Sequence, residues 1–374
     1  MPALLRSMST ARRIAPYVIV PVASTLATLL AIELLFRVVG IEGHYPEPRV
    51  DRVIPGCRSG EECAEGAVRI ADGLEASEAG YFPFANIVST YADDPRGYFE
   101  PGHTVSHVHN SAGWRDHEHP VAKPEGTLRI LGLGDSYLWG QGVHHDDRVL
   151  ELLEGKLVQT HPGVETLNTA RPGVNTWWQA TTLRARGLDY DPDLVILFFV
   201  LNDVEQDVHG PVPKVEFLTN YTNVYQSRDR FSEVSRLWSW ARQRVLATTR
   251  ARAYIDDCVD SFHDHSYKWQ LTTGALDDIQ AALDERDIPL LLVVFPFFWE
   301  LNGDYPFASI HDVVGQYATD HGLPLLDLRE AYSQFRGPEL WVHATDQHPN
   351  EVGHRIAADA VHAYLLDHPE LLAR

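Results

Sequence analysis

Short apolar runs alternate with amphipathic stretches along the chain from residue 128 onward. Runs rich in leucine and β-branched residues predict buried strands, and longer amphipathic stretches predict helices. The predicted strands are residues 129–133, 165–168, 194–199, 290–295 and 323–326. The predicted helices lie near residues 147–160, 175–187, 275–286, 308–320 and 350–366. Because helices lie between the strands, the pattern predicts an α/β fold: a three-layer α/β/α sandwich with a five-stranded parallel sheet.

Two stretches depart from this alternation. Residues 38–126 are rich in Pro, Gly, His and charged side chains, so they predict loops and short strands in a membrane-proximal segment. Residues from about 204 to about 270 are loop-like at first and then helical, and they predict an insertion in the main domain at 127–374. This insertion follows the third strand, which places it at the carboxyl edge of the sheet, where open α/β folds bind ligands.

The N-terminal region predicts a membrane-spanning helix at residues 16–37. The run is uncharged before Glu33, and a helix that crosses hydrocarbon needs about 20 mostly apolar residues. Glu33 lies near the end of the run, from where its side chain can reach the headgroup region. Three arginines precede the run and only one follows closely, so we expect residues 1–15 in the cytoplasm and the rest of the chain outside.

Two other interpretations of the apolar run remain open. A cleavable secretory signal would also have a basic start and an apolar stretch, but it should be shorter and end in small residues, and no convincing cleavage site follows. A buried core helix would need a partner, and nothing upstream provides one. The anchor and the signal both place the globular part outside the cytoplasm.

Charge and composition narrow the class of protein. The formal net charge is -21, from 31 basic and 52 acidic side chains, which would repel a phosphate backbone and excludes nucleic acid as a partner. Hydrophobic residues make up 44% of the chain, as in a globular protein with a substantial core. Cys57 and Cys63 enclose a short polar loop and form either a local disulfide or two unpaired thiols, whereas Cys258 has no evident partner.

Two polar motifs supply candidates for nucleophilic catalysis. The motif at 134–136 is Gly-Asp-Ser and follows the first strand, so Ser136 is expected at the carboxyl edge of the sheet. The motif at 346–350 is Asp-Gln-His-Pro-Asn and precedes the last helix. A serine nucleophile needs a base and an acid that orients the base, and His348 and Asp346 offer both. Each motif also has an ordinary structural explanation, the first as a turn and the second as a helix cap with an incidental histidine.

Four motifs in this order resemble those of the SGNH hydrolase family, also called the GDSL type. They are Gly-Asp-Ser after the first strand, a Gly after the second, Asn-Asp after the third, and Asp-x-His-Pro-Asn before the last helix. Here those positions are Ser136, Gly173, Asn202 and His348. The resemblance covers roughly residue 128 to the end, and the stretch 110–116 resembles the lead-in of membrane-anchored bacterial members. It implies a flavodoxin-like SGNH hydrolase fold without a cofactor or a metal.

The resemblance also implies a role for each matched residue. Ser136 would be the nucleophile, His348 the general base and Asp346 the residue that orients the imidazole. The backbone N–H groups of Ser136 and Gly173 and the side-chain amide of Asn202 would hold the oxyanion. Glycine lets the backbone approach the substrate closely, and loss of an amide donor from such a site costs about 3 kcal/mol of transition-state stabilisation.

Two positions depart from the family pattern. The glycine often found two residues before the asparagine is Val200 here, which would narrow or reshape the pocket. The acid lies two residues before the histidine, not three, so either Asp346 orients His348 from a different angle or a backbone carbonyl does so and leaves a dyad. We expect Asp135 and Asp203 to be structural, bonding the backbone or capping helices.

Other side chains near the motifs allow further interpretations. Alternate histidines of a strand face one side and invite a metal, but no carboxylate or cysteine ligands accompany them at a recognisable spacing. We therefore expect most of these histidines on the solvated surface: His103, His107, His109, His117 and His119. Four aromatic residues either line an acceptor groove or pack in the core: Tyr137, Trp139, Trp177 and Trp178.

Three functions fit the sequence. The first is a carboxylic-ester hydrolase that removes a small acyl group, such as acetyl, from a cell-envelope saccharide or lipid. The second is an O-acyltransferase of surface polysaccharide, which would use the same acyl-enzyme at Ser136. Exclusion of water from the site would distinguish these two. The third is a non-catalytic envelope protein that binds carbohydrate, which only Val200 and the shifted acid favour.

Overall fold

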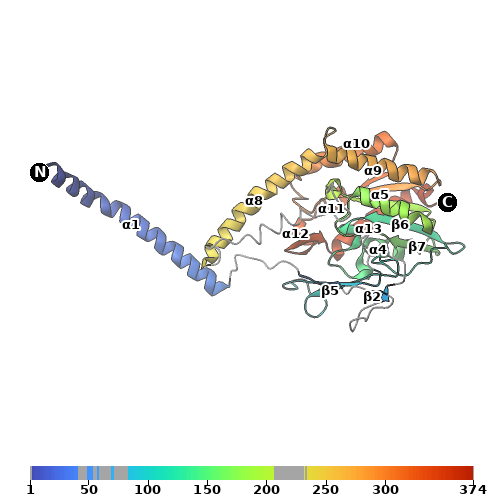
Figure 1. Ribbon diagram of the computed structural model, residues 1–374, viewed down its shortest axis with the longest axis horizontal. Coiled ribbons are helices and arrows are strands. Elements are labelled where there is room, and N and C mark those ends of the chain that lie inside the picture. The colour runs from blue at the N-terminus through green and yellow to red at the C-terminus, as the bar shows by residue number, and fades with distance from the viewer. Residues whose placement is uncertain are drawn as a thin grey trace. The chain divides into compact units, whose positions relative to one another are not determined.

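The computed structural model describes residues 2–40, 49–53, 57–58, 69–70, 83–205, 231 and 234–373. The chain divides into two compact units. The helical unit comprises Met1–Pro46 and Glu216–Arg252, and the sheet unit comprises Glu47–Val215 and Ala253–Arg374. The sheet unit holds the five-stranded sheet and every residue that the sequence motifs single out for catalysis (Figure 1).

The sheet unit is built on a parallel sheet. Its strands are β6 (Leu128–Gly134), β7 (Val164–Asn168), β8 (Leu194–Val200), β9 (Leu290–Phe295) and β10 (Leu325–Asp327). The order across the sheet is β10-β9-β8-β6-β7, and all neighbours are parallel. This is the flavodoxin-like order, and it confirms the predicted fold. The strand order reverses between β6 and β8, so their carboxyl ends border the crevice where such folds bind ligands.

Helices cover both faces of this sheet. One face packs against α4 (Val149–Leu157) and α13 (Glu351–Asp367). The other packs against α5 (Thr176–Ala185), α9 (Tyr267–Asp284) and α10 (Ala308–His321). The three predicted layers are therefore present, with the sheet in the middle.

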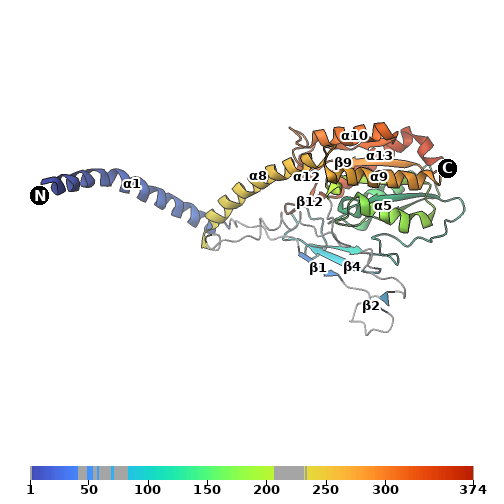
Figure 2. The same ribbon diagram turned by 45° about the horizontal axis from the view of Figure 1, so that its top comes forward.

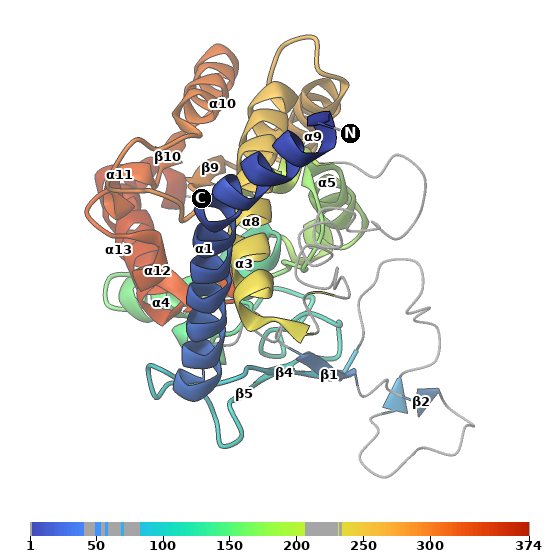
Figure 3. The ribbon, with the colours of Figure 1, turned by 90° about the vertical axis from the view of Figure 1, so that its left-hand side faces the viewer.

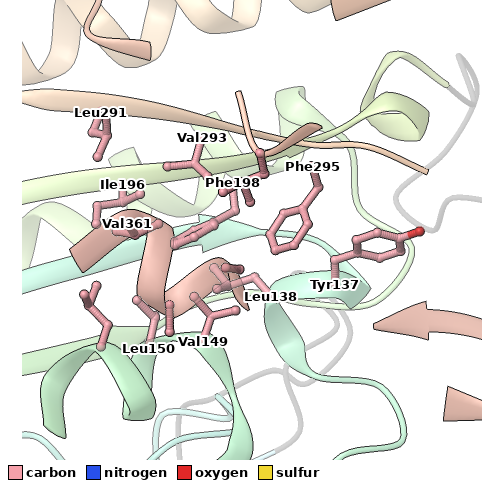
Figure 4. Packing of buried hydrophobic residues seen from close by; sticks show 14 of the residues in the cluster. Tyr137, Leu138, Val149, Leu150, Ile196, Phe198, Leu291, Val293, Phe295 and Val361 are labelled. Atoms are coloured by element: carbon pink, nitrogen blue, oxygen red, sulfur yellow. The ribbon is translucent and has the colours of Figure 1, made fainter. Parts of the chain in front are cut away.

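Strand β8 shows why the pattern of apolar residues predicted a buried sheet. Ile196 and Phe198 belong to the apolar cluster on one face, and Val195 and Leu197 belong to the cluster on the other. A strand buried on both faces has no polar side, which explains its unbroken apolar run. Figure 4 shows part of the first cluster, in which side chains of β8 and β9 meet those of α4 and α13.

Several shorter or displaced helices were not expected. Helix α3 (Ser136–Trp139) directly follows β6, and four residues are too few to show a helical period. Helix α9 begins at Tyr267, inside the stretch assigned to the insertion, which also contains α8 (Arg236–Ser261). Further short helices among the described residues are η1 (His145–Asp147), η2 (Gly187–Tyr190), η3 (Leu201–Val204), α11 (Arg329–Tyr332), α12 (Gly337–Leu340) and η4 (Pro369–Leu372).

The segment upstream of the main sheet forms short strands. An antiparallel sheet in the order β1-β4-β5 joins β1 (Arg49–Val53), β4 (Asn86–Thr90) and β5 (Thr104–Val108), and Figure 2 shows β1 and β4 apart from the parallel sheet. Strands β2 (Cys57–Arg58) and β3 (Arg69–Ile70) pair with each other. Cys63 lies outside the described residues, so the choice between a Cys57–Cys63 disulfide and two unpaired thiols stays a prediction.

Within the sheet unit, this upstream segment packs against the main domain. Tyr91 and Val105 form one buried apolar cluster with Val143 and Val342, which belong to the main domain. The segment therefore shares a core with the domain that carries the motifs.

The N-terminal helix α1 (Pro2–Val39) contains the predicted membrane span. Within it, Ile19–Val39 is long and apolar enough to cross a membrane by length and composition, and none of that window is buried. A helix with no buried residue in its apolar window does not fit the interpretation as a buried core helix. An anchor and a signal sequence both fit.

Candidate active site

Ser136 lies where β6 passes into α3. Asp135 caps this short helix, because its side chain accepts a hydrogen bond from the backbone N–H of Tyr137 at 2.8 Å. Only glycine fits at position 134, since a Cβ atom there would lie 2.7 Å from the Cβ of Leu138. The Gly-Asp-Ser motif thus permits a sharp strand-to-helix connection that leaves Ser136 at the carboxyl end of β6.

His348 and Asp346 lie on β12 (Asp346–Pro349), which pairs antiparallel with β11 (Trp341–His343). The last residue of the motif, Asn350, caps α13. Its side chain accepts hydrogen bonds from two backbone N–H groups in the first turn of α13, each at 3.0 Å. The cap and the catalytic candidate are therefore different residues of the same motif.

A continuous chain of hydrogen bonds joins the three side chains. Nε2 of His348 lies 2.9 Å from Oγ of Ser136, and Nδ1 of His348 lies 2.5 Å from Oδ1 of Asp346. With its proton on Nδ1, the imidazole donates to Asp346 and presents the lone pair of Nε2 to the serine hydroxyl. The acid two residues before the histidine thus contacts the ring directly, and no backbone carbonyl is needed to orient it.

The electrostatics of the pair favour proton uptake by the imidazole. Burial opposes protonation of His348, but the charge and hydrogen bond of Asp346, with the charge of Asp135, raise the pKa of His348 above its ordinary 6.5. Burial would raise the pKa of Asp346, but the charge and hydrogen bond of His348 and a hydrogen bond from Tyr91 lower it below 3.8. Asp346 is therefore an ionised carboxylate at neutral pH.

Gly173 lies in the turn after β7. Its φ is +71°, in the left-handed region that favours glycine. The chain after β7 runs beside the end of β6, since the backbone N–H of Arg171 donates to the carbonyl of Gly134 at 3.3 Å. The turn that carries Gly173 therefore lies close to the start of α3.

Asn202 approaches Ser136 from the opposite side, on η3 after β8. Its side-chain amide donates to Oδ2 of Asp135 at 3.3 Å, and the hydroxyl of Ser136 lies 3.3 Å from the same oxygen. The structure thus brings the side chains of Asn202, Ser136, His348 and Asp346 together around the carboxyl ends of β6 and β8.

Asp203 and Val200 have structural surroundings. Asp203 is buried and accepts hydrogen bonds from the backbone N–H of Val200 and from Nε2 of Gln179, both at 3.1 Å. Burial, and then the charge of Asp135, raise the pKa of Asp203 well above its ordinary range. Val200 is 0% exposed and belongs to the apolar cluster on one face of the sheet.

A tyrosine from the upstream segment extends the hydrogen-bonded chain. Tyr91 follows β4, and its hydroxyl donates to Oδ2 of Asp346 at 2.8 Å, whereas His348 uses Oδ1. Its side chain is 3% exposed, and its ring stacks on Phe99 with centroids 4.5 Å apart. The sequence carries no signal for this contact, because 255 positions separate Tyr91 from Asp346.

A second upstream residue holds the far end of α3. Arg115 is 1% exposed and donates to the carbonyl oxygens of Trp139 at 3.0 Å and of Gly140 and Val143 at 2.5 Å. These carbonyls end α3 and follow it. Arg115 lies in the stretch 110–116, so the resemblance of that stretch to anchored family members was the one sequence signal that pointed to it.

Two of the histidines singled out in the sequence are buried. His107 and His109 are 0% and 7% exposed, and their rings lie 4.5 and 6.0 Å from the ring of Trp139. The expectation of surface positions is wrong for these two, because alternate side chains from β5 onward face the interior. His103 and His117 are exposed, as expected.

Two overlapping groups of histidine and acidic side chains lie close enough to hold a metal ion: His117, His145 and Asp146, and Asp116, His145 and Glu151. Arg148 donates to Nδ1 of His145 at 3.2 Å and also to Glu151. Nε2 of His145 lies 3.0 Å from Nε2 of His117, so both ring nitrogens of His145 have hydrogen-bond partners within the protein. Burial and the charge of Arg148 lower the pKa of His145 to about 3, so the ring is neutral.

Two of the four aromatic residues after the motifs pack in the core. Tyr137 and Trp139 are 7% and 2% exposed and belong to the apolar cluster, with Tyr137 beside Phe295 in Figure 4. Trp177 is 49% exposed, and its ring meets that of Trp178 edge to face. Core packing thus accounts for the first two, and Trp177 presents its ring to solvent.

The comparison with protein families agrees with this geometry. The model of the GDSL-like lipase/acylhydrolase family matches residues 133–356, which is more than half of the chain. The chain belongs to this family. Membership confirms the resemblance carried by the four motifs, and it makes the protein an ester-hydrolysing enzyme of the GDSL type. It counts against the non-catalytic alternative. No curated protein matches the chain.

Solved structures similar to this GDSL enzyme have low sequence identity. A putative lipolytic protein of the G-D-S-L family from Desulfitobacterium hafniense is 12% identical, with a TM-score of 0.39, over 64% of this chain and 100% of its own. An acetylxylan esterase from Geobacillus stearothermophilus is 15% identical, with a TM-score of 0.41, over 64% of this chain and 94% of its own. A lipase/acylhydrolase from Enterococcus faecalis is 14% identical, with a TM-score of 0.38, over 65% of this chain and 97% of its own.

Proposed function

We propose that this GDSL enzyme cleaves a small acyl ester, such as an acetyl ester, of a cell-envelope saccharide or lipid by serine catalysis. The observation that carries the serine mechanism is the hydrogen-bonded chain from Ser136 through His348 to Asp346, with contacts of 2.9 and 2.5 Å. The choice of substrate rests on the family and on the apolar helix, which would hold the enzyme beside the envelope.

In the first half of the reaction, Oγ of Ser136 attacks the ester carbonyl carbon while Nε2 of His348 takes the hydroxyl proton. The negative charge that develops on the carbonyl oxygen is held by the backbone N–H groups of Ser136 and Gly173 and the amide of Asn202. The tetrahedral intermediate collapses, His348 returns the proton to the departing alkoxide, and an acyl-enzyme remains on Ser136.

In the second half, a water molecule attacks the acyl-enzyme and gives its proton to His348. Collapse of the second intermediate releases the carboxylic acid and restores the Ser136 hydroxyl. Asp346 keeps the imidazole in the required tautomer throughout and stabilises its protonated form. Tyr91 acts as a positioning residue, because its hydrogen bond fixes the carboxylate of Asp346 in turn.

The mechanism is tested by covalent labelling and by ester hydrolysis. A fluorophosphonate should label Ser136 in the native protein, and substitution of His348 should slow the labelling. With a short-chain nitrophenyl ester, Ser136→Ala should reduce kcat by about 10⁶-fold. A Ser136→Ala variant with native activity would refute the assignment of the nucleophile.

Acyl transfer to a saccharide hydroxyl is the second candidate function, because the same acyl-enzyme would serve it. The two are separated by adding an O-acylated donor together with an unacylated oligosaccharide and following the products by mass spectrometry. Free carboxylic acid alone supports hydrolysis. Acylated oligosaccharide that disappears in Ser136→Ala supports transfer.

We also propose that α1 is a retained anchor that holds the sheet unit on the extracytoplasmic side. The excess of arginine before the apolar run supports this orientation. In right-side-out membrane vesicles, an added protease should digest the sheet unit without detergent. Protection of the sheet unit in intact vesicles would reverse the orientation.

A further inference from the structure

The single carboxylate within the apolar part of α1 has its partners in the insertion. Glu33 accepts hydrogen bonds from Oγ of Ser235 at 2.8 Å and from the backbone N–H groups of Arg236 at 3.1 Å and Leu237 at 2.9 Å. It therefore caps the N-terminus of α8, although the two elements lie about 200 positions apart in the chain. Arg37 donates to the same carboxylate at 2.8 Å.

Further contacts hold the two helices together at this point. Nη2 of Arg37 donates to the carbonyl of Val234 at 2.6 Å, and the rings of Phe36 and Trp240 meet edge to face with centroids 5.7 Å apart. All of these residues belong to the helical unit, and Figure 3 shows α1 and the start of α8 beside each other. The start of α8 is therefore fixed to α1 at the level of Glu33.

The position of Glu33 sets the depth of this junction in a membrane. The apolar window Ile19–Val39 has 21 residues and is about 31 Å long, close to the thickness of a hydrocarbon core. Glu33 precedes Val39 by six residues, or about 9 Å along the helix. Helices that lie in a membrane surface bury their apolar face by about 5–10 Å. The junction thus places the start of α8 at the boundary between headgroups and acyl chains.

The helical unit exposes large apolar side chains at this boundary. Phe231, Val234, Trp238 and Val245, which we term the apolar patch, are 72%, 71%, 48% and 66% exposed. The rings of Phe231 and Trp238 lie 6.2 Å apart, and Trp238 and Val245 are seven residues apart on α8 and so share one face. Tryptophan is enriched at this depth in membrane proteins, and the arginines at 236, 242 and 244 have the charge that anionic headgroups attract.

We infer that the apolar patch is a membrane-binding surface, which inserts into the interface of the same bilayer that α1 spans. The occupant is lipid, because Glu33 and Arg37 tie the start of α8 to the apolar helix that would span the bilayer. This inference rests on the proposed anchoring by α1. It gives the insertion a function, which is to attach the enzyme to the membrane at a second place beside the anchor.

Site-specific fluorescence tests the contact. Cys57 and Cys63 are replaced by serine, buried Cys258 is retained, and an environment-sensitive NBD group is attached at Val234→Cys or Val245→Cys. The full-length protein is reconstituted in vesicles of phosphatidylcholine and phosphatidylglycerol. We expect blue-shifted emission and quenching by lipids that carry a nitroxide near the headgroup. The same label at Val158→Cys, 41% exposed at the C-cap of α4 in the sheet unit, is the reference and should show neither.

The possible outcomes separate failure of the membrane anchor from failure of the contact between the patch and lipid. Removal of the protein by a sodium carbonate wash would refute the anchor and the contact together. Retention in the membrane with water-like emission at positions 234 and 245 would refute the contact alone. Equal quenching at position 158 would also refute it, since the contact would not be specific to the patch. Concentration-dependent self-quenching without lipid quenching would show that a second copy covers the patch instead.

Substitution of Glu33 tests whether the junction between α1 and α8 sets the depth of the apolar patch in the membrane. Glu33→Ala removes the acceptor for the backbone N–H groups of Arg236 and Leu237 in the first turn of α8, so quenching at position 234 should fall. Glu33→Gln keeps one acceptor oxygen and should restore part of the quenching. Equal quenching in both variants and in the parent would show that Glu33 does not set the depth of α8.

Discussion

At the scale of single residues, the site depends on how His348 is held. Asp346 bonds one ring nitrogen and Ser136 the other, so the ring has one productive tautomer. The hydroxyl of Tyr91 occupies the remaining oxygen of Asp346. Each of these contacts leads to a measurable change in the dependence of activity on pH or in kcat.

The pH dependence of the native enzyme follows from the state of His348. The imidazole must be neutral to accept the proton of Ser136, and Asp346 raises its pKa above 6.5. We therefore expect kcat/KM for a neutral ester to rise with pH and to reach half its maximum above pH 6.5. A pH–rate profile checks this, and a midpoint well below 6.5 would contradict the described geometry.

Replacement of Asp346 by asparagine should remove the productive tautomer of His348, which carries its proton on Nδ1. An amide N–H pointing at Nδ1 would force the ring proton onto Nε2. A protonated Nε2 has no lone pair with which to accept the proton of Ser136. We expect kcat to fall by roughly 10³- to 10⁴-fold with little change in folding, measured by ester hydrolysis and by thermal unfolding. A fall in kcat of less than tenfold would instead indicate that Ser136 and His348 suffice as a catalytic dyad.

Tyr91→Phe should lower activity without disturbing the fold. The ring still stacks on Phe99, but Asp346 loses a hydrogen bond to a charged group, which is worth about 1.5–3 kcal/mol. We expect kcat to fall by about tenfold or more, KM to change little, and the pH profile of kcat/KM to shift.

Tyr98→Phe is the matched control, because the hydroxyl of Tyr98 donates to Asp147 and not to the catalytic residues. It should leave the pH profile unchanged. If both tyrosine variants lose the same activity, Tyr91 has only a structural role.

At the scale of elements, α3 positions the nucleophile and has no room for adjustment. A methyl group at position 134 would lie 2.7 Å from the Cβ of Leu138, so Gly134→Ala must displace α3 and with it Ser136. We expect a loss of about 1–3 kcal/mol in the free energy of unfolding, as for overpacked cores, and a larger proportional loss of kcat.

Gly155→Ala serves as the control for this variant. Gly155 lies within α4, and nothing lies within 4 Å of a Cβ atom built there. Alanine should therefore stabilise the helix by up to about 1 kcal/mol and leave kcat unchanged. Chemical denaturation and ester hydrolysis of both variants provide the comparison.

The elements of the main sheet were predictable because their signal is local. Buried strands such as β8 are unbroken apolar runs, and three of the four motifs follow β6, β7 and β8, whose carboxyl ends the topology brings to one edge. Helix α3 escaped prediction because it has four residues. The contacts of Tyr91 and Arg115 were not predicted from the sequence, because their partners lie far along the chain. A periodic pattern of residues predicts local structure and not a contact between a loop tyrosine and a distant aspartate. The burial of His107 and His109 follows the alternation of side chains along β5, but the sequence does not show which face of that strand is covered.

At the scale of the whole molecule, the motif residues all lie in the sheet unit and the apolar helix lies in the helical unit. Removal of residues 2–40 should therefore move the protein from the membrane to the soluble fraction. Its kcat/KM for a small water-soluble ester should match that of the full chain. Fractionation and kinetics check this, and loss of activity in a folded truncated protein would show that α1 supports the site itself.

The distance along the chain between Ser136 and His348 also affects biosynthesis. The two residues are 212 positions apart, and the serine hydroxyl has its base only after the strand with His348 has folded against α3. A nascent chain that has not yet reached position 348 therefore carries an unactivated serine. If α1 directs export during synthesis, the enzyme becomes competent only after translocation, which protects esters in the cytoplasm from premature cleavage.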